Sequence, residues 1–299
     1  MRAPRFREKE TPLAYAAFSE LLAAAELSGS LSASAIDRET AETAVAPAQL
    51  RVRMAETLTV MREAVATGLL GESRSRSGLT GGDAKRVAES TSGPVSGVFQ
   101  TAIAAALATV EVNAAMGRIV AAPTGGASGV LPAVILTVGA DRGSSEDELV
   151  DALFTAAAIG GIIAARATLS GAAGGCQAEV GSAAAMAAAA ATQLCGGTPE
   201  QIGHAASLAL QGLMGLVCDP VAGLVEVPCV HRNGTGCALS LAAAQMALAG
   251  IIFPVPLDEV IDAQSLVGRS LSPSLRETAQ GGLAITPTGR DLAEKARRK

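Results

Sequence analysis

Three of the five cysteines in this 299-residue chain lie in segments that could hold a metal. Cys176 follows a glycine-rich run at 170–175, and Cys218 and Cys229 stand at either end of a segment with two prolines. We expect loops at all three positions, because glycine and proline interrupt helices and glycine lets the backbone approach a bound group closely. Three convergent thiolates are soft ligands that suit zinc, copper(I) or an iron-sulfur cluster.

The spacing of these cysteines differs from that of the usual structural zinc site. Such sites carry paired Cys-x-x-Cys motifs, and the chain has none. An iron-sulfur cluster normally takes four cysteines, whereas these segments supply three, which would leave one iron open to a substrate. Cys195 and Cys237 are not expected to be ligands, because they lie among small apolar residues in helical contexts, where a thiol usually behaves as a small buried hydrophobe.

A glycine-containing segment at 73–83 also has the composition of a functional loop. It ends in Thr80, Gly81, Gly82 and Asp83. The adjacent glycines present backbone N–H groups and the threonine adds a hydroxyl, which together suit an anion such as a carboxylate. The alternative is a capping turn for a helix that begins at the aspartate.

A second loop of this kind spans 122–129 and contains Thr124 and Ser128. It lacks the Gly-Lys-Ser/Thr ending of a nucleotide phosphate loop, so a small anionic substrate fits it better than a nucleotide. Asn113 lies just upstream on a mostly apolar helix. A buried amide needs partners, so Asn113 is either satisfied within the core or contacts the substrate.

Acidic residues adjoin the candidate cysteines. Glu179 and Glu226 could hold a substrate ammonium group or exchange protons with it; alternatively they form salt bridges with Arg232 or another cation. Asp219 precedes a proline and could contact substrate or cap a turn. His231 follows the last of the three cysteines, and a neutral imidazole is a suitable base near neutral pH.

Together these motifs closely resemble the alpha chain of the iron-sulfur-dependent L-serine dehydratases. The resemblance rests on the spacing from Cys176 to Cys218 to Cys229 and on long strings across most of the chain. The strings are SGAAGGCQAEVGS at 170–182, CDPVAGLVEVPCVHRN at 218–233, LTGGDA at 79–84, EVNAAMG at 111–117, DEVIDA at 258–263 and RETAQGGLA at 276–284.

The resemblance implies a helical enzyme that converts L-serine to pyruvate and ammonia in amino-acid catabolism and gluconeogenesis. It implies a 4Fe-4S cluster on Cys176, Cys218 and Cys229, whose open iron acts as a Lewis acid on the serine hydroxyl. It also implies a beta chain, as a heterodimer or a higher oligomer, with a Ser-His-Thr motif that these 299 residues lack. We expect the catalytic histidine to come from that partner.

The chain departs from the family pattern at three places. His231 stands where the family often carries lysine, which favours a surface or supporting role for this histidine. Gln211 and Gly212 replace an expected Lys-Asn pair, so contacts to substrate or partner could differ. The segment 291–299 has no cysteine, whereas some members end in a cysteine that can occupy the open iron.

Three other functions share parts of this pattern. A pyridoxal phosphate lyase would need a Schiff-base lysine, and only Lys85 lies away from the ends of the chain. A related iron-sulfur L-cysteine desulfidase would release sulfide instead of water, and no residue separates the two leaving groups. A non-catalytic subunit stabilised by a cluster or by zinc is the alternative of another class, and the zinc form would be colourless.

Charge and hydropathy exclude other classes. The net charge is −5, and no basic stripe with interleaved aromatic residues predicts nucleic-acid binding. An odd number of cysteines and the absence of a signal peptide predict a cytoplasmic protein. The mean hydropathy of +0.37 is high, but the most apolar run, 152–165, is shorter than the roughly 20 residues of a membrane span. We expect a buried helical core and no membrane association.

The elements that must position these residues are helices. Alanine-rich periodic segments predict an all-α fold with helices near 11–27, 48–68, 101–118, 151–168, 180–194, 203–216, 234–250, 258–267 and 274–279. Capping boxes at Ser145/Glu148 and Thr198/Gln201 predict two helix starts. Only 133–138 has the composition of a strand. Residues 1–70 are expected to form an N-terminal helical arm, with its two helices joined by a polar serine-rich passage, and 71–299 the catalytic domain.

Overall fold

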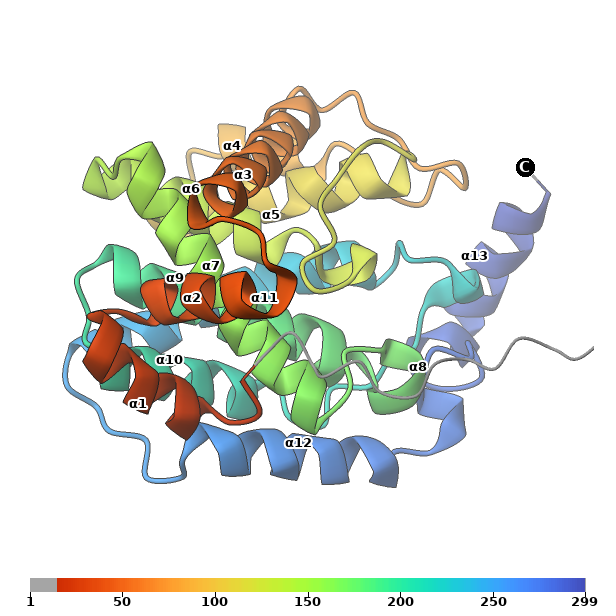
Figure 1. Ribbon diagram of the computed structural model, residues 1–299. Coiled ribbons are helices and arrows are strands. Elements are labelled where there is room, and N and C mark those ends of the chain that lie inside the picture. Colours follow the sequence, from red (N-terminus) through yellow and green to blue (C-terminus); the bar gives the residue numbers. More distant parts are fainter. Residues whose placement is uncertain (1–14, 299) are drawn as a thin grey trace, which may run out of the picture.

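The computed structural model describes residues 15–298, and this part of the chain is a bundle of helices joined by turns and several longer loops (Figure 1). The only β-type pairing among these residues is an isolated bridge between Cys218 and Arg276. The predicted all-α fold is therefore confirmed. The helices are α1 (Phe18–Ser28), α2 (Leu31–Thr43), α3 (Pro47–Leu69), α4 (Asp83–Glu89), α5 (Val98–Ala114), α6 (Val130–Arg142), α7 (Glu146–Arg166), α8 (Gly171–Gly174), α9 (Ser182–Leu194), α10 (Pro199–Gly212), α11 (Cys229–Leu248), α12 (Leu257–Ser270) and α13 (Pro287–Arg297).

The centre of the bundle is α9, whose side chains are mostly alanine. Its residues 182–192 are all buried, and α6, α7, α10 and α11 pack around it. Alanine side chains let neighbouring backbones come close, so one short helix can contact four others. This packing explains how a chain with so few aromatic residues can form a dense core: the apolar content is distributed over many small side chains.

Helix termini follow local sequence signals. Both predicted capping boxes are present: Ser145 accepts from the backbone N–H of Glu148, and Thr198 accepts from that of Gln201. In each case the residue three positions on accepts from the backbone N–H of the cap, so two N–H groups at the helix start are satisfied together. α9 ends at Leu194, just before Gly196 and Gly197, and Gly196 adopts a left-handed φ of 77°.

Three predictions of local structure were wrong. The apolar run 133–138 is not a strand but part of the buried helix α6, because a short apolar run does not distinguish a buried helix from a buried strand. The serine-rich passage forms α2, capped by Ser30 and anchored through buried Leu31 and Ile36. Residues 274–279 form only a 3-10 turn followed by an irregular loop.

The first helices pack onto the rest of the bundle. α3, predicted near 48–68, contacts α5 along its length, and α2 lies against α7. Gly68 permits the contact with α5, because a Cβ there would lie 2.2 Å from the carbonyl oxygen of Ala108. The division into an arm and a catalytic domain at residue 70 stays a prediction, and the helix start expected at Thr11 lies outside the described residues.

α7 is long and apolar enough to cross a membrane by length and composition. Most of its apolar window is buried against α2, α3 and α9, as expected of a core helix.

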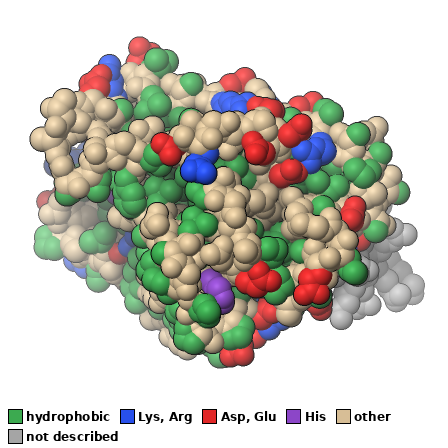
Figure 2. Space-filling model, turned by 90° about the vertical axis from the view of Figure 1, so that its left-hand side faces the viewer, with side chains coloured by type: hydrophobic (Ala, Val, Ile, Leu, Met, Phe, Trp, Pro, Cys, Tyr) green, Lys and Arg blue, Asp and Glu red, His purple; other side chains and the backbone are tan. Residues whose placement is uncertain are grey.

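Figure 2 shows the face at the left of Figure 1, where lysine and arginine side chains are few and lie among acidic ones.

Candidate functional site

The three predicted cysteines converge at one buried site. Cys176 lies between α8 and a π-helical turn, Cys218 lies in an extended loop, and Cys229 is the first residue of α11 and not a loop residue as expected. Their exposed fractions are 2%, 2% and 8%. The Cys218 thiol forms a hydrogen bond to the sulfur of Cys176, and Cys229 lies close enough for its charge to interact with both.

The protonation of these thiols indicates what would hold them together. The hydrogen bond from Cys218, and then the Arg232 guanidinium, lower the pKa of Cys176, whereas the same hydrogen bond raises the pKa of Cys218. Burial, and then the negative charges at Cys176 and Glu179, raise the pKa of Cys229 to about 12. The protein alone therefore favours one thiolate here, and three thiolates require a cation. A multiply charged metal centre fits this donor set.

The backbone of Gly171 packs closely against these sulfurs and Glu179. A Cβ at Gly171 would lie 2.5 Å from a carboxylate oxygen of Glu179 and 3.3 Å from the sulfur of Cys218. Any side chain at this position would therefore project into the site. The three thiol donors and the close approach of Gly171 both fit a cluster held by three cysteines.

Glu179 borders the site from the turn after Cys176. Thr124 donates a hydrogen bond of 2.7 Å to its carboxylate, so the glycine-rich loop 122–129 contacts the turn that follows Cys176. Burial, more than any other cause, raises the pKa of Glu179; the Thr124 hydrogen bond opposes this rise and the charge of Glu277 adds to it. Glu179 is therefore easier to protonate than an ordinary glutamate.

The rest of that loop is fixed by amide and hydroxyl contacts. Asn113 donates to the carbonyl oxygen of Gly125 at 3.2 Å, and the fully buried Ser128 hydroxyl donates to the same oxygen at 2.7 Å. Asn233 joins the loop to α11, because it accepts from the Gly129 N–H at 2.9 Å and donates to the Gly126 carbonyl at 2.7 Å. These three side chains shape the loop through its backbone.

The loop at 73–83 meets the site through Glu226. Ser77 donates a hydrogen bond to the Glu226 carboxylate, and Thr80 is buried and accepts from the Ser75 N–H at 3.1 Å. Gly81 and Gly82 have left-handed φ values of 138° and 84°, and a Cβ on the first would lie 2.3 Å from the Ser73 carbonyl. Only glycine fits that position.

Asp83 and His231 lie together at the edge of this loop. Asp83 begins α4 and forms an ion pair with Arg86 at 2.7 Å. The Nε2 atom of His231 lies 3.4 Å from an Asp83 carboxylate oxygen, and half of the histidine side chain is exposed. His231 therefore lies at the surface beside Asp83, where a supporting role fits it better than the role of a base inside the site.

Glu111 of α5 holds the end of the 73–83 loop through backbone hydrogen bonds. Its carboxylate is buried, with 1% of the residue exposed, and accepts from the backbone N–H groups of Asp83 at 2.6 Å and Ala84 at 3.3 Å. The second oxygen has no partner among the described residues. Burial is the largest cause that raises the pKa of Glu111, and the backbone hydrogen bonds oppose it.

This environment predicts a pH-dependent effect of Glu111→Gln. The pKa of Glu111 is higher in the folded than in the unfolded chain. As the pH rises from the unfolded toward the folded pKa, the wild type should therefore lose stability relative to the Glu111→Gln variant. Glu111→Ala should lose about 1–3 kcal/mol at neutral pH, since two N–H groups lose their acceptor. Urea unfolding from pH 4 to 8 measures both differences. A Gln variant that tracks the wild type at every pH would contradict the raised pKa.

Both carboxylate oxygens of Asp219 are held by other groups of the protein. It forms an ion pair of 2.8 Å with Arg232 and accepts from the backbone N–H of Leu283 at 2.7 Å. Arg232 therefore pairs with Asp219. The alternative salt bridges from Arg232 to Glu179 or Glu226 are not formed. The guanidinium also donates to the Val217 carbonyl at 2.8 Å and reaches the sulfur of Cys176.

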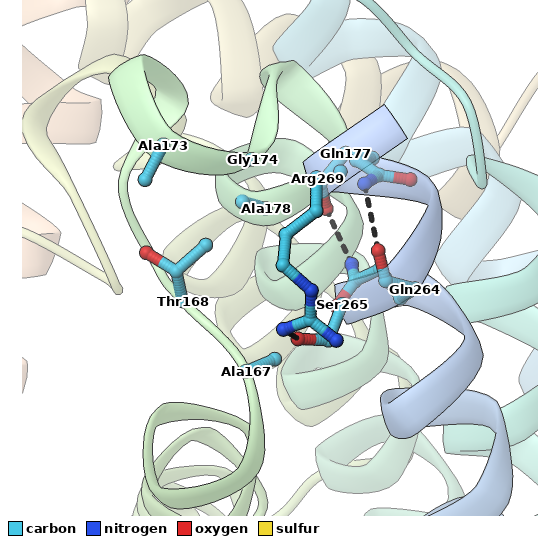
Figure 3. A pocket seen from close by; sticks show the side chains of 10 residues that line it. Ala167, Thr168, Ala173, Gly174, Gln177, Ala178, Gln264, Ser265 and Arg269 are labelled. Carbon is cyan, nitrogen blue, oxygen red and sulfur yellow. Dashed lines mark hydrogen bonds between the residues drawn. The ribbon is translucent and has the colours of Figure 1, made fainter. Parts of the chain in front are cut away.

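Sequence reasoning missed the residues that hold the cysteine loops in place. No site role was predicted for Arg232 and Asn233. Two adjacent polar residues within one helical turn of Cys229 are the sequence feature that could have indicated such a role. Gln177 was also missed. Its amide donates to the Gln264 carbonyl at 3.0 Å, and Gln264 returns a 2.7 Å hydrogen bond, which fixes the turn after Cys176 to α12 (Figure 3).

A small cavity of about 180 Å³ adjoins this pair of glutamines. Figure 3 shows Thr168, Arg269 and the two glutamines around it. Arg269 donates to Ser265 at 2.8 Å. None of the predicted site residues lines this cavity, so it lies outside the site described above.

A helical fold that gathers three buried thiols, carboxylates and glycine-rich loops defines a class, namely helical proteins with a candidate metal-dependent catalytic centre. The family model described as serine dehydratase alpha chain matches residues 26–284. The chain therefore belongs to the serine dehydratase alpha chain family.

Individual relatives agree with this assignment. The chain is 51% identical to the probable L-serine dehydratase alpha chain of Bacillus subtilis, over 81% of this chain and 82% of that protein. It is 42% identical to the L-serine dehydratase alpha chain of Peptoniphilus asaccharolyticus, over 82% and 85%. It is 49% identical to the L-serine dehydratase of Mycobacterium tuberculosis, but that match covers 60% of this chain and 40% of the longer relative.

Proposed function

We propose that this chain is the alpha subunit of an L-serine dehydratase that eliminates water from L-serine and releases pyruvate and ammonia. The observation that carries the proposal is the convergence of Cys176, Cys218 and Cys229 beside Glu179 in a member of this family. The names of the alpha-chain relatives from Bacillus subtilis and Peptoniphilus asaccharolyticus support the substrate.

The three cysteines would hold a 4Fe-4S cluster with one open iron. Bound there, the cluster would supply Lewis-acid activation of the departing hydroxyl. The residues of this chain orient and hold the substrate around it. Backbone N–H groups of the 124–128 loop would bind the substrate carboxylate. The Arg232 guanidinium balances negative charge at the cysteines.

Glu179 is the residue of this chain best placed to exchange a proton with the substrate. Its carboxylate lies beside Cys218 and its raised pKa allows it to hold a proton that an ordinary glutamate would lose. Glu226 and Asp219 are occupied by Ser77 and Arg232, so they support the site from behind. The loop that carries Thr80, Gly81, Gly82 and Asp83 is joined to Glu226 through Ser77, which supports a substrate-binding role for it.

The base that removes the alpha proton would come from a beta chain. The only histidine near the cysteines in residues 15–298 is His231, which faces Asp83 at the surface. The match to the alpha-named relatives over most of their length, and to only 40% of the longer Mycobacterium tuberculosis relative, supports a separate second part. The five free cysteines support a cytoplasmic location.

Pyruvate release from L-serine tests the proposal. The chain, purified without oxygen and loaded with iron and sulfide, is assayed with and without the beta chain encoded by the same organism. We expect a brown protein that oxygen bleaches and pyruvate formation that depends on the partner. Sulfide release from L-cysteine at a higher kcat/KM would favour the desulfidase, and a colourless protein that binds one zinc would favour a structural subunit.

A further inference from the structure

A second glutamate reaches the site from a different loop. Carboxylate oxygens of Glu179 and Glu277 and the sulfur of Cys218 all lie within 4.8 Å of one another. Cys218 is buried, Glu179 is partly buried and Glu277 is exposed. The carboxylates therefore lie on the solvent side of the buried Cys218 sulfur.

The backbone fixes Glu277 to the cysteine loop. The Glu277 N–H donates to the Cys218 carbonyl at 2.8 Å, and the Cys218 N–H donates to the Leu275 carbonyl at 2.9 Å. Glu277 itself adopts a left-handed φ of 62°, which is uncommon for a residue with a side chain. The short bridge holds its carboxylate toward Cys218 despite this conformation.

The two carboxylates lack a positive partner within the protein. Among residues 15–298, neither Glu179 nor Glu277 forms a salt bridge, and the nearby Arg232 pairs with Asp219. Like charges at this separation repel, so a cation placed between them would relieve the repulsion. Thr124 holds Glu179 in place, so the pair is positioned before any cation arrives.

We propose that Glu277, together with Glu179, binds the α-ammonium group of the amino-acid substrate. This inference rests on the proposed function and assigns a positioning residue to the same site. The thiols lie at the buried end, where the cluster would sit, and the exposed Glu277 lies at the entrance. A substrate held by its ammonium group at the entrance extends its remaining groups toward the thiols. The pair would select amino acids over hydroxy acids that lack the amino group.

Glu277→Gln tests the inference in the iron-loaded alpha chain without its beta chain, because L-serine is not consumed when the base of the partner is missing. Two dissociation constants are measured by calorimetry, one for L-serine and one for 3-hydroxypropionate, which keeps the hydroxyl and carboxylate but lacks the ammonium group. We expect L-serine to bind at least about tenfold more weakly and 3-hydroxypropionate to bind more tightly, because one unpaired carboxylate is gone. A merely structural role would weaken both. Glu56→Gln, which removes an exposed charge on α3, is the matched control and should change neither constant.

Three results would overturn the inference. Both ligands could weaken together, L-serine could bind the variant and wild type equally, or the visible spectrum of the substrate-free alpha chain could change, which would identify Glu277 as a metal ligand. Pyruvate formation by the wild type is recorded separately, with the beta chain present. A wild type that binds L-serine without forming pyruvate in the presence of the beta chain would contradict the proposed activity, while the two dissociation constants would still decide the role of Glu277.

Discussion

Cys218→Ala is expected to lose nearly all of its iron when the chain is reconstituted without oxygen. The sulfur is one of only three convergent thiols, and it also donates the hydrogen bond that stabilises the Cys176 thiolate. Loss of a partner outside the ligand set typically lowers metal affinity about 10–100-fold, and loss of a ligand should cost more. Iron and sulfide content per chain, with the visible spectrum, measures the effect.

Cys195→Ala provides the control, because Cys195 follows α9 and burial, not a neighbouring thiol, is the largest cause that raises its pKa. This variant should bind as much iron as the wild type. Cys237→Ala extends the control to a fully buried thiol in α11, although the small cavity it creates could reduce stability. Equal iron content in the Cys218 and Cys195 variants would show that the cluster is not held by the predicted thiols.

The helical fold and the grouping of Cys176, Cys218 and Cys229 could be predicted because they depend on local signals. Cysteines in glycine-rich and proline-rich segments differ visibly from cysteines in alanine helices, and capping boxes fix helix starts within a few residues. The strand predicted at 133–138 failed for the opposite reason. A helix buried on all sides has no polar face, so its residues carry no periodicity that separates it from a buried strand.

The supporting residues of the site could not be predicted, because their partners are distant in sequence. Asn233 contacts Gly126 and Gly129, more than a hundred residues away, and Asp219 meets the backbone of Leu283. Glu277 faces Glu179 only because the Cys218 loop pairs with the segment after α12. Polar residues in such positions resemble surface residues until the fold buries them.

Arg232→Met should be the most destabilising single change at the site that leaves the cysteines intact. The substitution keeps most of the side-chain volume but leaves the Asp219 carboxylate, 3% exposed, without its counter-charge. Breaking a buried ion pair from one side typically costs about 3–5 kcal/mol. Anaerobic urea unfolding measures the loss, and Arg298→Met is the control, since its pair with Glu294 is exposed and should contribute less than about 1 kcal/mol.

A double variant identifies the cause of that loss. Asp219→Asn keeps an oxygen to accept from the Leu283 N–H but removes the charge. If the unpaired carboxylate causes the instability, then Arg232→Met with Asp219→Asn should be more stable than Arg232→Met alone. If the double variant is less stable than either single one, the guanidinium acts mainly through the Val217 carbonyl and the Cys176 sulfur. In that case iron binding should fall along with stability, because the arginine would then serve the cysteine site directly.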